Sequence, residues 1–384
     1  MTTSAMRRSD RKARRRLSLL RGALPQYAAG MLIVLAATAE FASGPCLALE
    51  WGVNGGSPKR MDLAPVFQIM KERGLTRDRI GVNLTKDTEG IEAPMLRHVL
   101  AEAKSYNITL YPLFGFPFRW GDRTDAGNYP AGDRDALYKQ GFNRTYSFVD
   151  QFKHDITTWE LENEINLTAR GPDDKKLYGS GATAQEFESP IMEDWAAVLH
   201  GASDAIDKIN KDNGLQMHKE LNTTSTMLGF LDFMASRGVN FDKISYHYYE
   251  VLGQNPHRNW NGRNPPFDLF KKLASYGRHI DFNEVNCAEI YKPNYGNKPG
   301  DPLTEQCLKS INNTLTYIRD QKDAAIDSVS IYEMLDEPDK APPENRFGLM
   351  YDIKRAKIEL YLLSRFAGGA LSPDEEGALA SSGL

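Results

Sequence analysis

The sequence predicts an α/β fold, because short apolar, β-branched runs alternate with helix-like segments from about residue 50 onward. Eight such runs can be counted, and the intervals between them can each hold a helix and its loops. The run "GVNGG" at 52–56 does not fit the glycine-rich phosphate turn of a doubly wound sheet. Eight βα units in a chain of this size match a single-domain (β/α)8 TIM barrel.

The eight predicted strands are rich in β-branched, aliphatic and aromatic residues. They are residues 49–56, 79–84, 107–116, 156–164, 218–226, 243–249, 279–286 and 328–335. Helix-like segments lie between them, and several open with Pro and close with Gly, as in "PVFQIMKERG" at 65–74.

Residues 1–48 are predicted to be a signal peptide. They hold eight Lys or Arg against only Asp10 and Glu40, and the uncharged run "YAAGMLIVLAATA" follows at 27–39. Cleavage near Ala39 or Ala48 would export the protein to the periplasm or the medium. An uncleaved anchor and an amphipathic basic helix are the alternatives, although the run is shorter than the roughly 20 residues of a spanning helix. We therefore expect no stable membrane span after cleavage.

Removal of residues 1–48 changes the charge of the chain. The whole chain has a formal charge of −4, but removal leaves 39 of its 47 basic and 49 of its 51 acidic residues, a charge of about −10. Such a surface opposes binding to nucleic acid. We expect a catalytic barrel at 49–366 and an unstructured tail at 367–384, which is small, polar and acidic.

The two cysteines beyond the signal segment, Cys287 and Cys307, leave two interpretations open. Export would allow them to form a disulfide, and a pair of free buried thiols is equally compatible with the sequence. No CxxC or HExxH motif is present, and the seven histidines are scattered. We therefore expect no metal site and no cofactor.

Polar residues gather at the predicted carboxyl ends of the strands, where barrels of this kind place their functional side chains. Glu164 and Glu284, at the ends of the fourth and seventh strands, could face each other across the barrel mouth. Paired carboxylates suit glycosidic cleavage. A lone strand-end glutamate is more often solvated or ion-paired, but here the flanking residues strengthen the functional interpretation. The full set is Asn54, Asn83, Asn163, Glu164, His247, Tyr249, Glu284, Asn286, Glu333 and Asp336.

Three glutamates alternate in the predicted fourth strand, "TTWELENEINL" at 157–167. Alternation would place Glu160, Glu162 and Glu164 on one side of the strand. Because buried carboxylates are costly, Glu160 should have a basic or hydrogen-bonding partner inside the barrel. The role of Glu162 stays open at this point: it could tune Glu164, bind a polar substrate group or pair with an arginine.

Four elements resemble the clan A glycoside hydrolases, which are retaining (β/α)8 enzymes, and most closely the family 39-like members. "WELENEINL" resembles the fourth-strand pattern F-E-V-W-N-E-P-N-L, which implies that Glu164 is the acid/base and that Asn163 binds the sugar 2-hydroxyl. "HIDFNEVN" resembles the seventh-strand pattern I-x-I-T-E-W-N, which implies that Glu284 is the nucleophile. The galactanase-like and heparanase-like branches match equally at Asn-Glu-Ile-Asn, so the exact family stays open.

The other two elements lie in the sixth and eighth strands. "FDKISYHYY" resembles an H-x-Y element, which implies that His247 and Tyr249 contact the substrate and the nucleophile. "SIYEMLDEPDKAPPENRFGLMYD" resembles the closing strand. The sequence departs from the pattern at Glu162 in place of Trp, at Ile165 in place of Pro, at Asn283 in place of Thr and at Tyr332-Glu333 in place of Trp.

The resemblance implies double displacement on a carbohydrate substrate, with Glu164 protonated and Glu284 ionised at the outset. Tyr249 should hydrogen-bond the nucleophile, and the neighbouring charge should make Glu164 titrate higher. Asn54, Trp120 and Glu333 are further predicted substrate contacts. The alternatives are a non-catalytic carbohydrate-binding or matrix protein and, less well supported, a metal-dependent hydrolase. Some aromatic residues could stack on sugar rings, although core packing is the more common explanation for each one alone: Trp51, Phe116, Phe118, Trp120 and Trp159.

Overall fold

The structure is a computed structural model. It describes residues 49–55, 61–85, 88–116, 132–168, 180–250, 255–259, 265–287, 302–341 and 344–384. The predicted signal peptide at 1–48 lies outside these residues, as do Trp120 and Phe118. No helix in the described ranges is both long enough and apolar enough to cross a bilayer.

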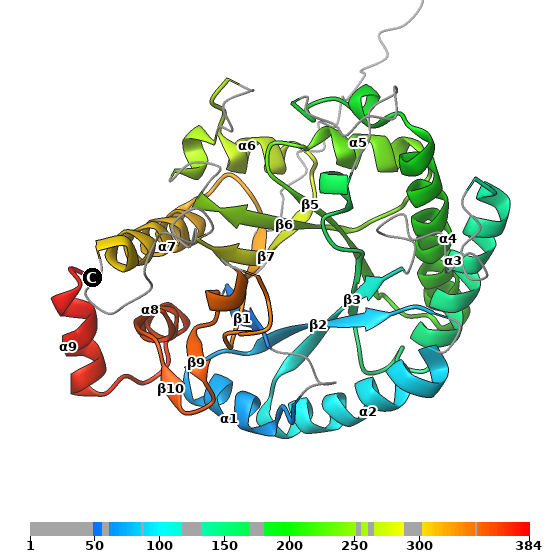
Figure 1. Ribbon diagram of the computed structural model, residues 1–384. Coiled ribbons are helices and arrows are strands. Elements are labelled where there is room, and N and C mark those ends of the chain that lie inside the picture. Colours follow the sequence, from blue (N-terminus) through cyan, green and yellow to red (C-terminus); the bar gives the residue numbers. More distant parts are fainter. Residues whose placement is uncertain are drawn as a thin grey trace, which may run out of the picture. The chain divides into compact units, whose positions relative to one another are not determined.

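Eight parallel strands close into a barrel, which confirms the predicted (β/α)8 TIM fold (Figure 1). Each strand pairs with the next one along the chain, and β1 pairs with β8 to complete the ring. The strands are β1 (Glu50–Asn54), β2 (Arg77–Asn83), β3 (Thr109–Gly115), β4 (Thr158–Leu161), β5 (His218–Thr224), β6 (Lys243–Tyr249), β7 (His279–Asn286) and β8 (Ile326–Ile331).

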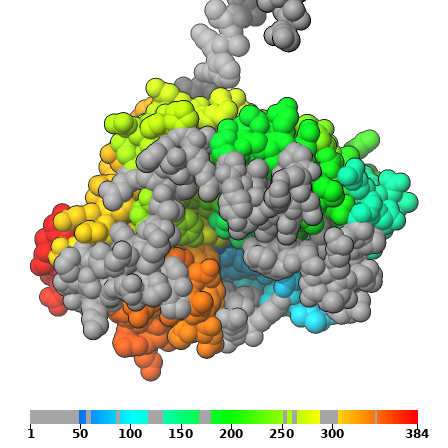
Figure 2. Space-filling view, turned by 45° about the horizontal axis from the view of Figure 1, so that its top comes forward, coloured from blue at the N-terminus to red at the C-terminus, as the bar shows by residue number. Residues whose placement is uncertain are grey.

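Helices surround this barrel, as Figure 1 shows. Figure 2 shows one face of the molecule. Surface from the middle of the chain (green) lies at its upper right, and surface from the C-terminal part (orange to red) lies at its bottom and left. A small hairpin, β9 (Met350–Asp352) and β10 (Arg355–Ala356), precedes α8. The helices are α1 (Ala64–Glu72), α2 (Thr88–Tyr106), α3 (Arg134–Val149), α4 (Pro190–Asn213), α5 (Gly229–Ser236), α6 (Leu269–Ala274), α7 (Pro302–Asp320), α8 (Ile358–Ala367) and α9 (Pro373–Ser381).

The predicted strand boundaries agree best for β6 and β7, whose observed ranges equal the predicted ones. β8 ends at Ile331 rather than at residue 335, and β4 ends at Leu161 rather than at residue 164. Glu162 and Glu164 have φ values of +69° and +48°, so the backbone leaves the extended conformation there. The expected alternation of three glutamates on one side of a strand is therefore wrong, and the three side chains point to different partners.

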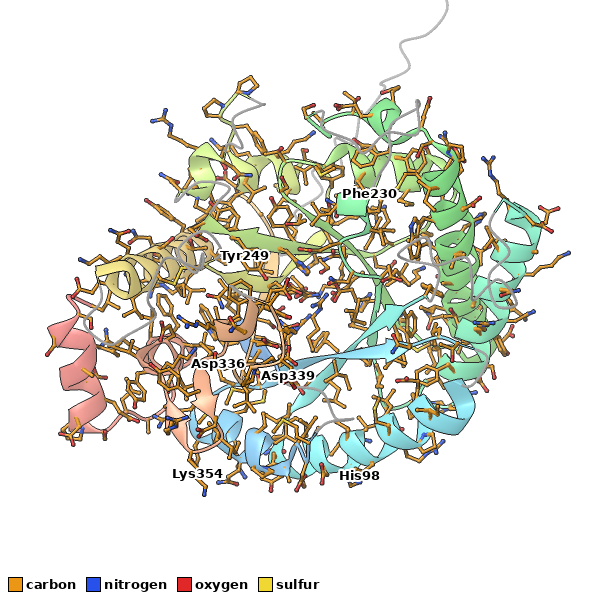
Figure 3. All side chains as sticks on the ribbon, in the orientation of Figure 1. His98, Phe230, Tyr249, Asp336, Asp339 and Lys354 are labelled. Carbon is orange, nitrogen blue, oxygen red and sulfur yellow. A yellow bond between two sulfur atoms is a disulfide. The ribbon has the colours of Figure 1, made fainter. Side chains whose placement is uncertain are left out.

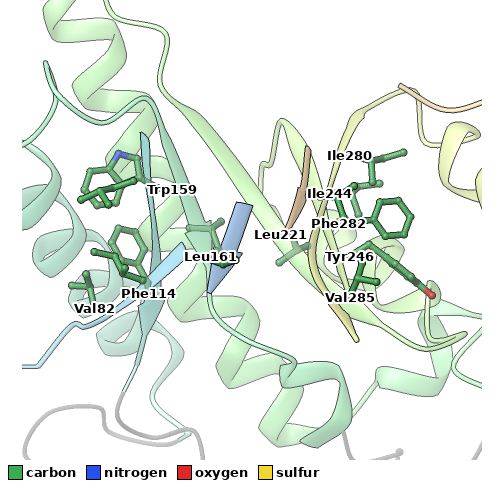
Figure 4. Packing of buried hydrophobic residues seen from close by; sticks show 14 of the residues in the cluster. Val82, Phe114, Trp159, Leu161, Leu221, Ile244, Tyr246, Ile280, Phe282 and Val285 are labelled. Atoms are coloured by element: carbon green, nitrogen blue, oxygen red, sulfur yellow. The ribbon is translucent and has the colours of Figure 1, made fainter. Parts of the chain in front are cut away.

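Apolar side chains on the outer face of the barrel pack beneath the helices. Figure 4 shows Val82, Phe114 and Trp159 from β2, β3 and β4 in one group, with Ile280 and Phe282 of β7 in another. All five are 2% exposed or less. Trp159 stacks on Phe114 with ring centroids 5.2 Å apart. This layer is the main hydrophobic core, and Trp159 belongs to it rather than to a sugar platform.

The inside of the barrel is polar, unlike the branched apolar filling that is usual for this fold. Gly52 permits a close approach of β1 to β2, because a Cβ there would lie 2.4 Å from the carbonyl oxygen of Arg77. Buried polar residues contributed by the strands to the interior include Arg77, Arg79, Glu160, Glu220, Asn222, Ser245, Asp281, Asn283 and Ser328.

Cys287 and Cys307 form a disulfide, which decides the question that the sequence left open. Cys287 directly follows β7, Cys307 lies on α7, and both are fully buried. The bond closes a loop of 20 residues, and in the chain-entropy model it stabilises the fold by about 3 kcal/mol.

The tail at 367–384, expected to be unstructured, instead contains α9. The helix begins with a capping box in which Ser372 and Glu375 satisfy each other's backbone N–H groups. Both terminal nitrogens of Arg73 donate hydrogen bonds to Glu375, from Nη1 to Oε2 at 3.0 Å and from Nη2 to Oε1 at 2.7 Å. The side chain of Leu379 is fully buried. A cap, a bidentate ion pair and one apolar anchor therefore order a segment whose composition indicated disorder.

Candidate active site

Arg79 on β2 is the centre of the candidate site, although the sequence analysis did not single it out. It binds Glu160 in bidentate fashion, with Nε to Oε2 at 2.6 Å and Nη2 to Oε1 at 2.9 Å. Nη1 donates to Glu284 Oε1 at 2.7 Å. The two remaining N–H groups donate to Asn54 Oδ1 at 2.9 Å and to Asn163 Oδ1 at 2.7 Å. All five guanidinium donors are thus satisfied.

Glu160 has the partners inside the barrel that the sequence predicted. Besides Arg79, it accepts hydrogen bonds from Ser245 Oγ at 2.7 Å and from Asn283 Nδ2 at 3.0 Å. Burial would raise the pKa of the Glu160 carboxyl, but the charge and hydrogen bonds of Arg79 outweigh it and hold that pKa below its usual value. Glu160 is therefore an ionised anchor that fixes Arg79.

A β-bulge turns Glu284 toward the interior. Ser245 and His247 of β6, two residues apart, pair with Asp281 and Glu284 of β7, which are three residues apart. The extra residue shifts the alternation, so Asp281 and Glu284 both face inward. The carboxylate of Glu284 then lies between Arg79 and the side chains of β6. The residue pattern of the seventh strand did not reveal this bulge.

Tyr249 and His247, both predicted from the sixth strand, contact the proposed catalytic carboxylates. Tyr249 Oη donates to Glu284 Oε2 at 2.7 Å. Burial and the nearby carboxylates raise the pKa of Tyr249 well above its usual value, so the phenol keeps its proton. Figure 3 labels Tyr249 among the side chains around the barrel axis, whereas His98 on α2 lies at the outer rim.

Glu164 is the more exposed of the two proposed catalytic carboxylates. Its side chain is 22% exposed, compared with 8% for Glu284. His247 is fully buried, and its Nδ1 lies 2.8 Å from Glu164 Oε1 and 3.3 Å from Glu284 Oε2. One oxygen of each carboxylate and a ring nitrogen of His247 lie within 4.8 Å of one another. The structure therefore brings together two residues that are 120 positions apart.

Glu162 binds two backbone N–H groups at the ends of β3 and β4. Its Oε2 accepts the backbone N–H of Phe116 at 2.7 Å, and its Oε1 accepts that of Asn163 at 3.2 Å. The side chain is fully buried. Glu162 thus ties the end of β4 to the end of β3 and holds the turn that carries Asn163 and Glu164.

Two of the predicted substrate contacts are occupied by protein groups. Asn54 accepts from Arg79 and donates through Nδ2 to the backbone oxygen of Asn283 at 2.9 Å, so it supports Arg79 instead of facing a ligand. Asn163 Oδ1 accepts a hydrogen bond from Arg79. The residue is only half-buried and directly precedes Glu164.

Glu333, predicted from the eighth strand, lies just beyond β8 and is 5% exposed. Its Oε2 lies 3.7 Å from the ammonium of Lys340, which also pairs with Glu337 and donates to Tyr332 Oη. Burial, together with the nearby Glu337 and Glu284 charges, raises the pKa of Glu333 to about 8 despite Lys340. At neutral pH this carboxyl is mainly protonated and can donate a hydrogen bond.

The predicted aromatic platforms are not confirmed where they can be located. Trp51 is 6% exposed and packs on Phe366 at 5.3 Å between ring centroids. Phe116 is 1% exposed and lies 6.3 Å from Phe114. Trp120 lies outside the described residues, so its contact with substrate stays a prediction.

The grouping of Glu164, His247 and Glu284 is also close enough to hold a metal ion. The guanidinium of Arg79 lies 2.7 Å from Glu284 Oε1, however, and its charge repels a cation at that oxygen. The arrangement therefore fits acid–base and nucleophilic chemistry better than metal ligation.

Sequence reasoning missed Arg79 and Asn222 as members of the site. A signal for the first was present in "TRDRI", where Arg77 and Arg79 are two residues apart and so share one face if the strand predicted at 79–84 begins two residues earlier, as β2 does. Two arginines facing a barrel interior require buried carboxylates as partners. Asn222 carries no comparable signal, because a single asparagine in a strand is common.

Comparisons with known proteins support this fold. No protein-family model and no curated protein matches the chain. Among solved structures, a family 39 glycoside hydrolase from Bacteroides cellulosilyticus WH2 is 16% identical with a TM-score of 0.60 and covers 84% of this chain. The chain spans 64% of the length of that enzyme.

A second neighbour is a β-glucosidase from Thermotoga maritima in complex with deoxynojirimycin. It is 12% identical, has a TM-score of 0.59, and the match covers 84% of this chain and 98% of that one. Another structure from this organism is described as a family 1 β-glucosidase; it is 12% identical with a TM-score of 0.56, and the match covers 80% of this chain and 86% of that one. At these identities the likeness is one of fold, that of the (β/α)8 barrel.

Proposed function

We propose that the chain is a retaining β-glycoside hydrolase acting on a polysaccharide or oligosaccharide, with Glu284 as nucleophile and Glu164 as acid/base. The observation that carries this proposal is the approach of one oxygen of Glu164 to one of Glu284 within 4.8 Å. Retaining enzymes have carboxyl groups about 5–5.5 Å apart, whereas inverting enzymes need about 6.5–9.5 Å to admit a water molecule.

In the first step Glu284 attacks the anomeric carbon, and the bond to the leaving oxygen breaks as Glu164 protonates that oxygen. Arg79 binds Glu284 Oε1 and Tyr249 binds Oε2, so the carboxylate is held in one orientation before substrate arrives. Both bonds are 2.7 Å long, and the one to the attacking oxygen must lengthen as that oxygen forms the bond to the anomeric carbon.

In the second step Glu164, now ionised, removes a proton from water, which attacks the glycosyl–Glu284 ester and returns both carboxyls to their initial states. His247 Nδ1 lies close to one oxygen of each glutamate, so it can hydrogen-bond to whichever of the two is ionised in a given step. No cofactor takes part in either step.

The substrate contacts that we propose are the NH2 group of Asn163, whose oxygen Arg79 already holds, and the mainly protonated carboxyl of Glu333. His247 and Tyr249 complete the wall from β6. Trp120 remains a proposed stacking residue. We also propose that residues 1–48 direct export, which would place the enzyme among extracellular or periplasmic polysaccharides.

The test is hydrolysis of a panel of aryl β-glycosides and bacterial exopolysaccharides by the mature protein and by two variants. We expect turnover by the wild type and a loss of about 10⁴-fold or more in Glu284→Gln. Glu164→Gln should lose most activity on substrates with poor leaving groups and recover with azide, which needs no general base. Wild-type turnover in either variant contradicts the assignment. Inactivity of all three proteins, with retained binding, favours a carbohydrate-binding protein.

A further inference from the structure

A chain of hydrogen bonds joins Glu160 to Glu164 through β5 and β6. It begins at the ionised Glu160, which accepts the hydroxyl proton of Ser245. The next member is Asn222 of β5, which lies 2.9 Å from Ser245 Oγ and 2.8 Å from His247 Nε2. His247 Nδ1 then reaches Glu164 Oε1 at 2.8 Å.

The backbone of Glu164 fixes the orientation of the Asn222 amide. The N–H of Glu164 points at Asn222 Oδ1 at 2.7 Å, and only an oxygen can accept there. The NH2 group of Asn222 must therefore face Ser245 and His247. The Ser245 hydroxyl donates its hydrogen bond to Glu160, so the Ser245 oxygen can accept a hydrogen bond from the Asn222 NH2 group.

The second Asn222 proton points at His247 Nε2, which must accept it and so carries no proton of its own. The neutral ring then holds its proton on Nδ1, which faces Glu164 Oε1. The ionisable groups around the ring are Glu160 of β4, Glu164 three residues beyond the end of β4, and Glu284 of β7, with Arg79 of β2 behind them.

We propose that Asn222 is a positioning residue that locks His247 as the neutral Nδ1–H tautomer and thereby places the acid proton of Glu164 on Oε2, the oxygen not bonded to His247. Because Glu164 Oε1 accepts a hydrogen bond from His247 Nδ1–H, the acid proton of Glu164 is bonded to Oε2. Asn222 also holds the backbone N–H of Glu164, whose φ is positive. This inference rests on the proposed function for its catalytic meaning.

The proton placement can be measured without any substrate. In protein labelled with 15N-histidine, long-range 1H–15N spectra distinguish the two neutral tautomers and the imidazolium, and the signal lost in His247→Gln identifies this ring. We expect a protonated Nδ1 and an unprotonated Nε2 in the wild type at pH 7, because Nε2 accepts from Asn222 and Nδ1 faces Glu164 Oε1. An Nε2–H tautomer or an imidazolium at pH 7 in the wild type overturns the inference.

Asn222→Asp is the sharpest variant, because the carboxylate still accepts the Glu164 N–H but replaces the NH2 group with an acceptor. His247 should become an imidazolium, which lowers the pKa of Glu164 and moves the alkaline limb of kcat/KM down by about one pH unit or more. Activity on a substrate with a poor leaving group should fall about 10²- to 10³-fold. Activity on a dinitrophenyl glycoside, which needs little acid assistance, should fall less than about tenfold.

Thr224→Val is the matched control, since Thr224 lies on the same strand and donates to the backbone oxygen of His247 at 3.0 Å rather than to its ring. It should leave the pH profile and the His247 spectrum as in the wild type. Equal losses on good and poor leaving groups in Asn222→Asp would contradict the inference. If no glycoside is hydrolysed but the Nδ1–H tautomer is found, the proton placement stands and the proposed function fails.

Discussion

The barrel interior contains two networks of polar and charged side chains, which are built from similar residues but differ in their roles. The upper network, toward the carboxyl ends of the strands, comprises Arg79, Glu160, Glu284, Asn54 and Asn163. The lower network, toward their amino ends, comprises Arg77, Glu220, Lys243, Asp281, Asp327 and Ser328.

The centre of the lower network is buried. Arg77 and Asp281 are fully buried and their charged atoms lie 3.2 Å apart, and the ring of Tyr111 covers the Arg77 guanidinium at 3.2 Å. Burial would raise the pKa of Asp281, but Arg77 and Lys243 reverse this and hold it below its usual value. Arg77 and Asp281 therefore neutralise each other inside the barrel.

The upper network ends instead beside Glu164, whose side chain is 22% exposed. Arg79 holds Glu284 with one nitrogen only, and the partly exposed Glu164 lies beside it. The same kind of buried arginine–carboxylate pair can thus fill a barrel or, under the proposed function, orient a nucleophile, depending on whether a partly exposed carboxylate lies beside it. Asn283 joins the two networks, since it accepts from Arg77 at 2.8 Å and donates to Glu160 at 3.0 Å.

The largest effect that separates the networks should come from Arg79→Met. It leaves Glu160 and Glu284 without their cation, and breaking such a pair costs about 3–5 kcal/mol of stability. Because the orientation of the nucleophile is lost as well, kcat/KM should fall about 10³-fold or more. Chemical denaturation and steady-state kinetics on the same preparation measure both. A stable, active variant would show that the upper network is not needed for the site.

Arg77→Met is the partner experiment in the lower network. It should cost a similar 3–5 kcal/mol, because Asp281 loses an ion pair inside the barrel. The folded fraction should keep kcat within about tenfold of the wild type, since Arg77 touches neither Glu164 nor Glu284. A loss of activity as large as in Arg79→Met would erase the distinction between the two networks.

Glu220→Gln tests the protonation of the lower network. Burial and the adjacent Asp281 raise the pKa of Glu220 well above 4.5, so the folded protein holds a proton that the unfolded chain releases. The wild type should therefore lose stability as pH rises above about 4.5 toward the folded pKa, and Gln, which mimics the protonated form, should lose less. Urea midpoints from pH 4 to pH 8 measure this difference, which we expect to reach about 1–3 kcal/mol. Parallel curves for the two proteins would mean that Glu220 is ionised.

The smallest effect should come from Ser328→Ala, which removes one hydroxyl that donates to Asp281. A hydrogen bond to a charged group contributes about 1.5–3 kcal/mol at most, and Lys243 and Arg77 still hold the carboxylate, so we expect a loss near 1 kcal/mol. Thermal unfolding detects it, and kcat should not change. A change in kcat would mean that the lower network reaches the catalytic residues.

The fold and the two proposed catalytic glutamates could be predicted because they leave local signals. Strand-like runs, their spacing and the polar residues at their ends all stand in the sequence, and β6 and β7 were predicted to the residue. The partner of Glu160 could be predicted as a kind of residue, since a buried carboxylate requires one.

The remaining features depend on contacts between distant segments. The bulge in β7, the positive φ of Glu162 and its bond to Phe116 arise from how neighbouring strands meet. The α9 helix exists because its cap and Leu379 find partners elsewhere in the fold. Trp51 and Trp159 are core residues, as the more common of the two explanations of each aromatic residue predicted.

The most direct test of the central claim is covalent trapping of the nucleophile. The mature protein is incubated with a panel of 2-deoxy-2-fluoro β-glycosides, and the labelled peptide is located by mass spectrometry. A retaining mechanism predicts inactivation with one equivalent of sugar attached to Glu284 and no label in Glu284→Gln. A sugar on Glu164 or Glu333, or hydrolysis with inversion of the anomeric configuration, would contradict it.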